Sequence, residues 1–206
     1  MFKKNLRVSG IVKMKEKLLL VDSGGLGRIT LDHATQEYAC FFVDDGYIIG
    51  CKICGSKVVG RTTDLKALFT DYKLLVVTIG NNKLRKKIYE EAKRIGYSFP
   101  NIICNSVYIS PFAKIGNGCV ILNNVVIQNG ASVGNGVILN VGVAIHQDSV
   151  VGNYGLIYTN SVVRTKARVG ESVKIGSNVT IGNYGVLPDD TIIEDGEAFR
   201  NSMVKE

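Results

Sequence analysis

Two histidines are the side chains of this chain best suited to take up a proton near neutral pH. His33 falls in an expected helix of the N-terminal half, and we interpret it as a structural or surface residue. His146 stands in the segment 145–150, IHQDSV, and Asp148 follows two residues later. A histidine with a carboxylate close by can remove the proton of an attacking amine or hydroxyl. This segment is therefore the predicted site of proton transfer.

A glycine-rich turn, SGGLG, follows the apolar segment 17–21 and precedes an expected helix. Backbone N–H groups at such a helix start can face a phosphate. A tight connection between a strand and a helix explains the same glycines equally well. The candidate substrate-binding residues of this turn are Ser23, Gly24, Gly25 and Leu26.

Polar residues also follow two other expected strands. Ligands of open α/β sheets bind at the carboxyl ends of the strands, where these residues would lie. Asp44 and Asp45 could accept hydrogen bonds from a ribose or a base, or could belong to a solvated turn. Arg85 could bind substrate or be a charge on the surface of a helix. The second candidate group consists of Gly80, Asn81, Asn82 and Arg85.

The elements that position these residues alternate between strands and helices up to about residue 100. This alternation predicts a small parallel sheet with helices on its faces. Along the last helix, Leu84, Ile88 and Ala92 recur at helical spacing, so the charged residues are expected to face solvent. The expected strands are KLLLV, CFFVDDG, VVG and LLVVTIG, and the expected helices are ITLDHATQ, DLKALFTDY and NNKLRKKIYEEAKRIG.

The second half has a period of six. Ile, Leu or Val occupies every sixth position from Ile103 to Ile193, and smaller residues follow four positions later. This period fits short strands whose coils stack on one another. Gly116, Gly134 and Gly152 are 18 residues apart, which predicts a three-sided prism of about five coils. Glycine and asparagine at its corners are expected to adopt positive φ.

Composition excludes several classes of function. No apolar run approaches the roughly 20 residues of a membrane span, and no secretory signal is evident, so a cytoplasmic protein is expected. The net charge of +7 suits an anionic ligand, but no basic stripe interleaved with aromatics predicts nucleic-acid binding. The five cysteines are expected to be free thiols, and Cys51 and Cys54 lack a second pair, so no metal site is expected. Residues 1–13 precede Met14 and are interpreted as an extension from an upstream start codon.

The motifs together resemble a known family. The hexads resemble the left-handed β-helix of hexapeptide-repeat acyltransferases. The strings LLLVDSGGLGRITLD, FFVDDG, IGNNKLRKKIYEEAKRIG and NSVYISPFAKIG resemble the sialic-acid O-acetyltransferase and UDP-amino-sugar N-acetyltransferase family. The resemblance covers nearly the whole chain from Met14. It implies a Rossmann-like nucleotide-sugar-binding domain over residues 14–100 and a left-handed β-helix acyltransferase domain over residues 101–206.

The resemblance also implies a reaction and an assembly. The expected activity is acetyl transfer from acetyl-CoA to a UDP-linked amino sugar in bacterial surface-glycan biosynthesis. The protein would be a cytoplasmic homotrimer without a metal, with acetyl-CoA in a groove between neighbouring prisms. The acceptor would meet the thioester at the subunit interface. The expected coenzyme-binding residues are Asn140, Leu156, Thr165 and Asn183.

The predicted catalytic corner departs from the family pattern. The family's histidine corresponds to Gln147, and His146 stands one residue earlier, which turns a side chain to the other side of an extended segment. A local bulge or a corner change could bring His146 to the same point, with Asp148 orienting it. Alternatively, Gln147 replaces the base and the enzyme is slow or inactive, or catalysis relies on positioning the amine.

Two further departures bear on function. Leu26 replaces the histidine of the family's GGHG turn, and Leu156 stands where a second histidine is often found. Two alternative functions therefore remain: a catalytically silent scaffold that binds a sugar nucleotide, and an O-acetyltransferase for a sialic-acid-type sugar.

Overall fold

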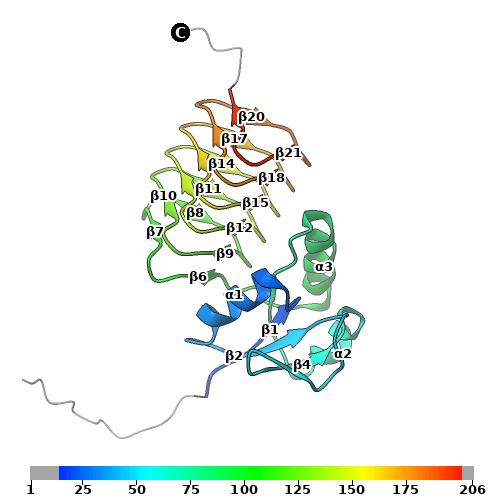
Figure 1. Ribbon diagram of the computed structural model, residues 1–206. Helices are drawn as coiled ribbons and strands as arrows, with labels where there is room; N and C mark the ends of the chain where they lie inside the picture. Colours follow the sequence, from blue (N-terminus) through cyan, green and yellow to red (C-terminus); the bar gives the residue numbers. More distant parts are fainter. Residues whose placement is uncertain (1–13, 201–206) are drawn as a thin grey trace, which may run out of the picture.

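The computed structural model of the chain describes residues 14–200, so the interpretation of residues 1–13 lies outside it. A small α/β domain lies at one end, and a stacked coil of short strands rises from it (Figure 1). Helix α3 (Asn82–Ile95) lies beside the lower coils, and the two parts pack against each other along a broad surface.

The α/β domain contains one five-stranded sheet in the order β3-β4-β2-β1-β5. The predicted strands are present, but the sheet is mixed, because β3 runs antiparallel to β4. The turn between them places Cys54 and Gly55 at φ 48° and 83°, which returns the chain alongside itself. The strands are β1 (Lys17–Val21), β2 (Ala39–Val43), β3 (Lys52–Ile53), β4 (Ser56–Gly60) and β5 (Leu74–Val77). The helices are α1 (Gly25–Ala34), the 3-10 helix η1 (Thr62–Asp64), α2 (Leu65–Leu68) and α3 (Asn82–Ile95).

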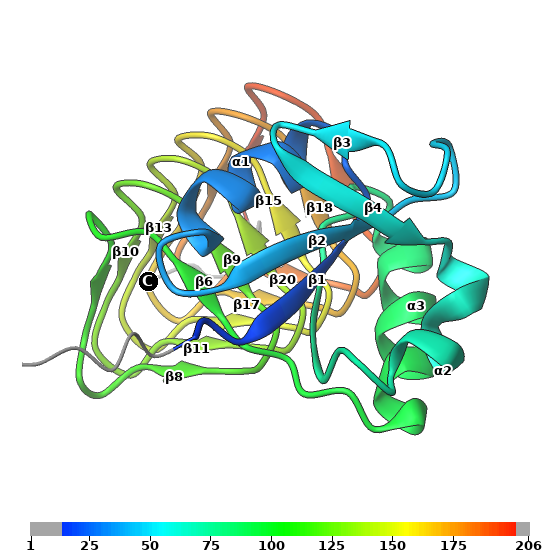
Figure 2. The same cartoon turned by 90° about the horizontal axis from the view of Figure 1, so that it is seen from below.

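The two faces of this sheet pack against different neighbours. Alternate residues of a strand point to opposite faces. Leu18 and Leu20 of β1 therefore pack toward α1 and the β-helix, whereas Leu19 and Val21 pack toward α2 and α3. Figure 2 shows α1 on the side of the sheet that faces the coils and α2 and α3 together at its other side. Helices thus cover both faces, as the alternation predicts.

The second half forms three stacks of parallel two-residue strands, with six, six and five strands. Residues 18 apart pair directly, as in Ala144 with Val126 and Val162. This confirms the left-handed parallel β-helix. The first stack contains β6 (Ile102–Ile103), β9 (Val120–Ile121), β12 (Ile138–Leu139), β15 (Leu156–Ile157), β18 (Lys174–Ile175) and β21 (Ile192–Ile193). The second contains β7 (Tyr108–Ile109), β10 (Val126–Ile127), β13 (Ala144–Ile145), β16 (Val162–Val163), β19 (Thr180–Ile181) and β22 (Ala198–Phe199). The third contains β8 (Lys114–Ile115), β11 (Ser132–Val133), β14 (Val150–Val151), β17 (Arg168–Val169) and β20 (Val186–Leu187).

The sixfold pattern identifies the interior of the prism. The second residue of each strand points inward, and Ile121, Ile127 and Leu139 are fully buried. Ile103 is 40% exposed because it lies at the open lower end, and Ile109, Ile115 and Phe199, in the coils at the two ends, are half-buried. Burying such side chains is worth roughly 1.5–3 kcal/mol each, so the repeat stabilises every coil.

The corner glycines have the predicted role at one corner position and a different role at another. Gly118 and Gly136 adopt positive φ, 71° and 60°, as expected. Positive φ occurs at the third corner residue, which is often not glycine, as at Asp148 (φ 59°) and Lys166 (φ 58°). Gly134 stands at a first corner position, where a Cβ atom would lie 2.7 Å from the backbone N of Asn153 in the next coil. The 18-residue glycine spacing therefore reflects close approach of neighbouring coils.

Candidate active site

A pocket of about 350 Å³ lies at the carboxyl ends of the parallel strands of the α/β domain. From β1, the chain passes to β2 on one side and later returns to β5 on the other. Ligands of open α/β sheets bind at such a switch point. The pocket is lined by Val21, Asp22, Val43, Asp44, Asp45, Gly46, Thr62, Ile79 and Leu84.

Ser23 and Asp44 connect the loops that follow β1 and β2. Asp44 Oδ2 accepts hydrogen bonds from the backbone N–H and the hydroxyl of Ser23, and its Oδ1 accepts one from the N–H of Gly46. Burial disfavours the charged carboxylate, but these donors outweigh it and lower the pKa of Asp44. The pair therefore holds a carboxylate at the pocket wall.

Asp22 shapes the beginning of α1. Its backbone has φ 81°, and its Oδ2 accepts a hydrogen bond from the N–H of Gly24 at 3.1 Å. Burial and the negative charge of Asp44 raise the pKa of Asp22. A Cβ atom on Gly27 would lie 2.0 Å from the carbonyl oxygen of Asp22, so only glycine fits there. Part of the glycine-rich motif thus serves the tight turn.

The remaining predicted residues of this domain differ in accessibility. Asp45 accepts hydrogen bonds from the N–H and hydroxyl of Thr62, at 2.7 and 2.8 Å, and remains exposed at the pocket rim. Gly25 is exposed, with open space where a Cβ atom would lie. Leu26 packs at the edge of the apolar cluster between α1, the sheet and the β-helix. His33 is half-buried on α1.

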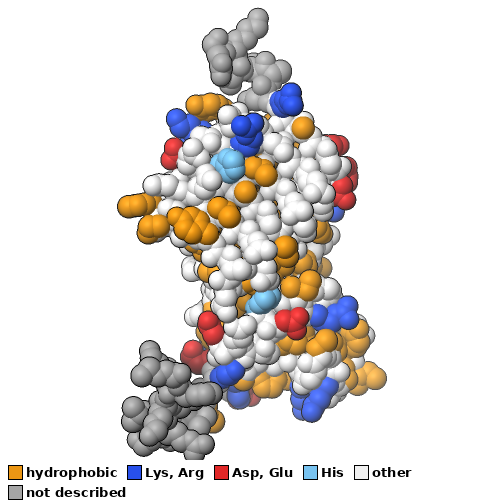
Figure 3. All heavy atoms as spheres, turned by 60° about the vertical axis from the view of Figure 1, so that its left-hand side comes forward, with side chains coloured by type: hydrophobic (Ala, Val, Ile, Leu, Met, Phe, Trp, Pro, Cys, Tyr) orange, Lys and Arg blue, Asp and Glu red, His pale blue; other side chains and the backbone are white. Residues whose placement is uncertain are grey.

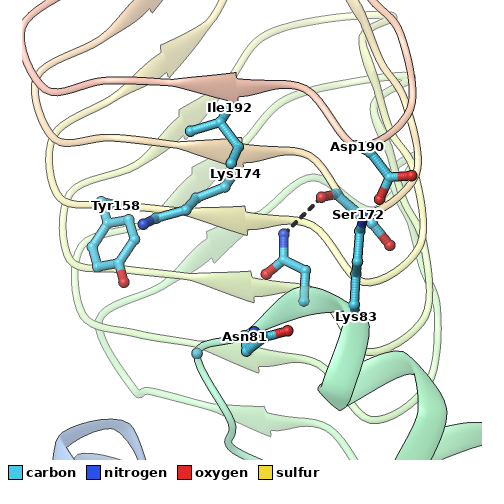
Figure 4. A pocket seen from close by; sticks show the side chains of 9 residues that line it. Asn81, Lys83, Tyr158, Ser172, Lys174, Asp190 and Ile192 are labelled. Atoms are coloured by element: carbon cyan, nitrogen blue, oxygen red, sulfur yellow. Dashed lines mark hydrogen bonds between the residues drawn. The ribbon is translucent and has the colours of Figure 1, made fainter.

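A second pocket of about 440 Å³ lies between the start of α3 and the outer face of the first stack (Figure 4). In the figure, Asn81 and Lys83 approach it from α3, and Tyr158 and Lys174 from the β-helix. Lys174 lies over the ring of Tyr158, 5.7 Å from the ring centroid. The other lining residues are Gly80, Asn82, Ser172, Asp190 and Ile192. Sequence reasoning missed this pocket, although Lys174 and Ile192 are 18 residues apart on one stack.

Two asparagines at the start of α3 make structural hydrogen bonds beside the second pocket. Asn81 caps the helix, because its side-chain oxygen accepts a hydrogen bond from the N–H of Leu84 at 3.0 Å. Asn82 donates from its side-chain nitrogen to the carbonyl oxygens of Ser172 and Val173, at 2.8 and 3.1 Å. Both residues line the pocket, and Asn82 also attaches the start of the helix to the β-helix.

Arg85 is not a substrate-binding residue in this structure, and it is not a surface charge either. It is 0% exposed, and its guanidinium donates to side-chain and carbonyl oxygens of both domains. Burial lowers its pKa to about 10. Leu84, expected on the buried face of α3, is 44% exposed instead. Ile88 and Ala92 are buried as expected, and Arg85 takes the place of Leu84 in the buried stripe. The corners of the β-helix offer carbonyl acceptors to its guanidinium.

The His146 corner follows strand β13 without a bulge. Ala144 and Ile145 pair in register with the strands of the coils below and above, and the N–H of His146 donates to the carbonyl oxygen of Val163 at 2.8 Å. The proposed local bulge is therefore wrong, because the regular ladder fixes the backbone. His146 is half-buried and Gln147 is exposed, so both side chains can meet a ligand at this corner.

The carboxylate of Asp148 does not orient the imidazole of His146. Its Oδ1 lies 2.3 Å from where a Cβ atom on Gly130 would be, so the carboxylate reaches over the coil below. Within residues 14–200, no hydrogen bond or ion pair joins Asp148 to His146. The hydroxyl of Ser149 donates to the carbonyl oxygen of His146 at 2.5 Å. The corner thus holds His146 through its backbone.

The predicted coenzyme positions are not all at one place. Gln147, Thr165 and Asn183 are 18 residues apart and stack at the corner after the second stack. Asn140 lies at the corner after the first stack, 8% exposed, and donates to the carbonyl oxygen of Ile157 at 3.4 Å. Leu156 is 0% exposed and packs against the α/β domain, so it cannot contact a coenzyme.

The histidines themselves lie apart. Figure 3 shows two separate pale-blue groups on one face, with basic side chains next to the upper one. By register, Arg164 lies one coil above His146, because Ile145 pairs with Val163. The corner therefore combines an imidazole with a cationic neighbour.

Three further observations concern membrane spans, metal ligands and cysteines in the described part of the chain. No helix between residues 14 and 200 is long and apolar enough to cross a membrane. The same residues contain no group of three or more His, Cys, Asp or Glu side chains that could hold a metal ion. All five cysteines are free thiols, and Cys40, Cys104 and Cys119 are buried.

The chain is similar in sequence and in fold to known proteins. Residues 17–92 match the family model described as the PglD N-terminal domain. The acetyltransferase domain of PglB from Neisseria gonorrhoeae FA1090 is 26% identical, with a TM-score of 0.85 over 90% of this chain and 92% of that one. The same domain in complex with acetyl coenzyme A is 27% identical, with a TM-score of 0.74 over 89% of this chain and 95% of that one.

A third structure supports the fold alone. PerB from Caulobacter crescentus, in complex with CoA and GDP-perosamine, is 24% identical, with a TM-score of 0.59 over 86% of this chain and 91% of that one. Its likeness extends over both the α/β domain and the β-helix. The predicted family resemblance is thus confirmed: residues 17–92 match the PglD N-terminal domain, and the chain as a whole is similar to hexapeptide-repeat sugar acetyltransferases.

Proposed function

We propose that the chain is an acetyl-CoA-dependent acetyltransferase that acts on a nucleotide-linked amino sugar, UDP-linked, in glycan biosynthesis. The observation that carries the proposal is the adjacency of two pockets, of about 350 and 440 Å³, along one loop. Ile79 lines the first pocket, and Gly80 and Asn81 line the second. Both volumes lie in the range of small-molecule sites, and a nucleotide sugar has two parts to place.

The similar structures support the substrate class. PglB's acetyltransferase domain binds acetyl coenzyme A, and PerB binds CoA together with GDP-perosamine, a nucleotide-linked sugar. A carboxylate such as Asp44 or Asp45 at the first pocket suits the hydrogen-bond donors of a ribose or a base. The uridine base is proposed from the sequence resemblance.

The reaction needs few groups from the protein. The sugar amine attacks the thioester carbonyl carbon, the C–N bond forms, the C–S bond breaks, and coenzyme A leaves as the thiol. His146 takes the proton of the attacking amine and passes it to the departing sulfur, so that the thiol is the product. Holding the amine against the thioester supplies a large part of the rate enhancement, because it removes the entropy cost of their encounter.

We further propose that the chain forms a trimer in which this corner meets a neighbouring subunit. The outward residues of the second stack include the half-buried Val126, Ala144 and Val162, a flat apolar face. Such a face favours association with a second copy. Acetyl-CoA would then lie in the groove beside Gln147, Thr165 and Asn183. Both substrates belong to the cytoplasm, where we place the protein.

A catalytically silent scaffold is the second candidate. The observation that favours it is the lack of any hydrogen bond or ion pair between His146 and Asp148 in the described residues, so no carboxylate orients the imidazole. In addition, Leu26 and Leu156 pack in an apolar cluster where the family resemblance expects histidines.

One assay separates these functions. Thiol release from acetyl-CoA is followed with a thiol dye in the presence of UDP-linked and GDP-linked amino sugars. Release above the rate without enzyme excludes the silent scaffold. Nucleotide-sugar binding without release contradicts the transferase. Running sialic acid as an acceptor in parallel distinguishes O-acetylation from N-acetylation.

A further inference from the structure

Arg85 is an arginine buried between two domains without a carboxylate partner among the described residues. Its Nη1 donates to the carbonyl oxygen of Ile79 at 2.6 Å, and Nη2 donates to Asn82 Oδ1 at 2.8 Å. On the other side, Nε donates to the carbonyl oxygen of Gly136 at 3.1 Å. Nη2 also donates to the carbonyl oxygens of Tyr154 and Gly155, at 2.6 and 3.1 Å. One guanidinium therefore joins the two parts of the chain.

The acceptors on the α/β side belong to the loop between β5 and α3. Ile79 lines the pocket at the carboxyl ends of the strands, whereas Asn82 lines the pocket against the β-helix. This loop is thus the wall between the two pockets. The position of this loop sets the distance between the two pockets, and so the distance between the two parts of a ligand that occupies both pockets.

The acceptors on the β-helix side belong to successive coils. Gly136 and Tyr154 are third corner residues, 18 apart, with φ 60° and 57°. The chain from Gly136 to Tyr154 makes one full coil, and that coil carries His146. A rigid ladder of strand pairs joins its corners. The guanidinium thus fixes the loop relative to the coil that carries the proposed base.

We infer that Arg85 is a positioning residue that holds the loop 79–82 at a fixed place on the β-helix and so sets the spacing of the two pockets for a nucleotide sugar. This inference rests on the proposed function for its substrate. The planar guanidinium is suited to the role, because its donors diverge in fixed directions toward acceptors in both domains. A lysine ammonium keeps the charge but cannot span the same acceptors.

The first experiment measures hydrogen–deuterium exchange in the full chain. Arg85→Lys is the conservative variant, and Arg85→Met removes the charge. Lys86→Ala is the matched control, because it removes a neighbouring ion pair between the same two domains. In that pair Lys86 is exposed and Glu171 is half-buried. We expect at least tenfold faster exchange in residues 78–86 for Arg85→Lys. Exchange in the upper coils, residues 160–190, should match the wild type, and Lys86→Ala should match it throughout.

The second experiment measures kinetics with UDP-linked amino sugar and acetyl-CoA. We expect Arg85→Lys to raise the KM for the nucleotide sugar at least tenfold, with the KM for acetyl-CoA changed less than twofold. The affinity for UDP alone, which fits the first pocket, should change less than threefold by calorimetry. A purely structural role would raise both KM values and weaken UDP binding together.

The two experiments fail in different ways. Unchanged exchange in residues 78–86 of both Arg85 variants overturns the inference, whatever the activity. Uniformly faster exchange across the chain also overturns it, because Arg85 would then contribute only to global stability. Faster exchange confined to the loop, in a protein that transfers no acetyl group, supports the positioning role and contradicts the proposed function instead.

Discussion

The hydroxyl and the backbone N–H of Ser23 both donate to one oxygen of Asp44, at 2.5 and 2.8 Å. The pair joins the loops after β1 and β2, on which the first pocket depends. It gives the glycine-rich turn a partner 21 residues away. A fixed carboxylate, that of Asp44, therefore lies beside the turn whose backbone N–H groups could face a phosphate.

Replacing Asp44 with Asn is expected to lower the free energy of unfolding by about 1–3 kcal/mol. An amide has one acceptor atom, so it cannot accept both from Ser23 and from Gly46. Nucleotide binding should weaken as well. Urea unfolding and calorimetry with UDP and GDP provide the measurements. Asp32→Asn on the exposed side of α1 is the control. Equal stability of Asp44→Asn and the wild type would contradict the role of the pair.

The pH dependence of this difference has a definite sign. The pKa of Asp44 in the folded chain lies below its ordinary 3.8. Its stabilisation is therefore complete well above pH 3.8 and is lost as pH falls through the lowered pKa. The gap between wild type and Asp44→Asn should be widest near neutrality and close in acid, as measured by urea unfolding at several pH values. A gap that widens on acidification is the contrary outcome.

Replacing His146 with Ala is expected to reduce turnover at least about a hundredfold, because the amine then loses its base. The thiol-release assay measures this. His33→Ala, on α1 and remote from the corner, should match the wild type. Gln147→His restores the family's residue at the exposed corner position and should increase turnover. Unchanged turnover in His146→Ala would contradict the role of His146 as the base. The acetyl transfer would then rely on positioning of the amine, or the chain would not catalyse it.

Replacing Gly134 with Ala is expected to destabilise the β-helix by about 1–3 kcal/mol. Its Cβ atom would press on Asn153 of the next coil, at 2.7 Å from the backbone N. Gly25→Ala, where a Cβ atom meets no other atom within 4 Å, is the matched stability control. Thermal unfolding compares the two. Similar midpoints for both variants would refute close coil approach as the reason for the 18-residue spacing.

Light scattering on the wild type is expected to give about 67 kDa, three times the 22.4 kDa chain. Val162→Asp introduces a charge into the apolar face of the second stack and should yield monomers, because an unpaired buried charge is costly. Lys57→Asp, exposed on the α/β domain, should remain trimeric. Trimers of Val162→Asp would exclude this face as the interface.

The sequence by itself determined the β-helix and the order of strands and helices in the first half. A period of six, maintained from Ile103 to Ile193, permits only one kind of stacked coil, because every sixth side chain must enter one core. Likewise, polar residues after buried strands indicated the carboxyl edge where Asp44 now lines a pocket. These features depend on local spacing, which a sequence records directly.

Only the tertiary structure decided which of these polar side chains are available to a ligand. Arg85 and Asp44 both followed expected strands or began helices, yet one is enclosed by carbonyls of the β-helix and the other faces a pocket. Leu156 and Val162 likewise occupy the same place in the repeat, as the first residues of β15 and β16, but of these two only Leu156 lies beneath the α/β domain. Such contacts join residues that are 50 or more positions apart, as in Arg85 with Gly136. The docking of one domain on the other decides them, and no local pattern records it.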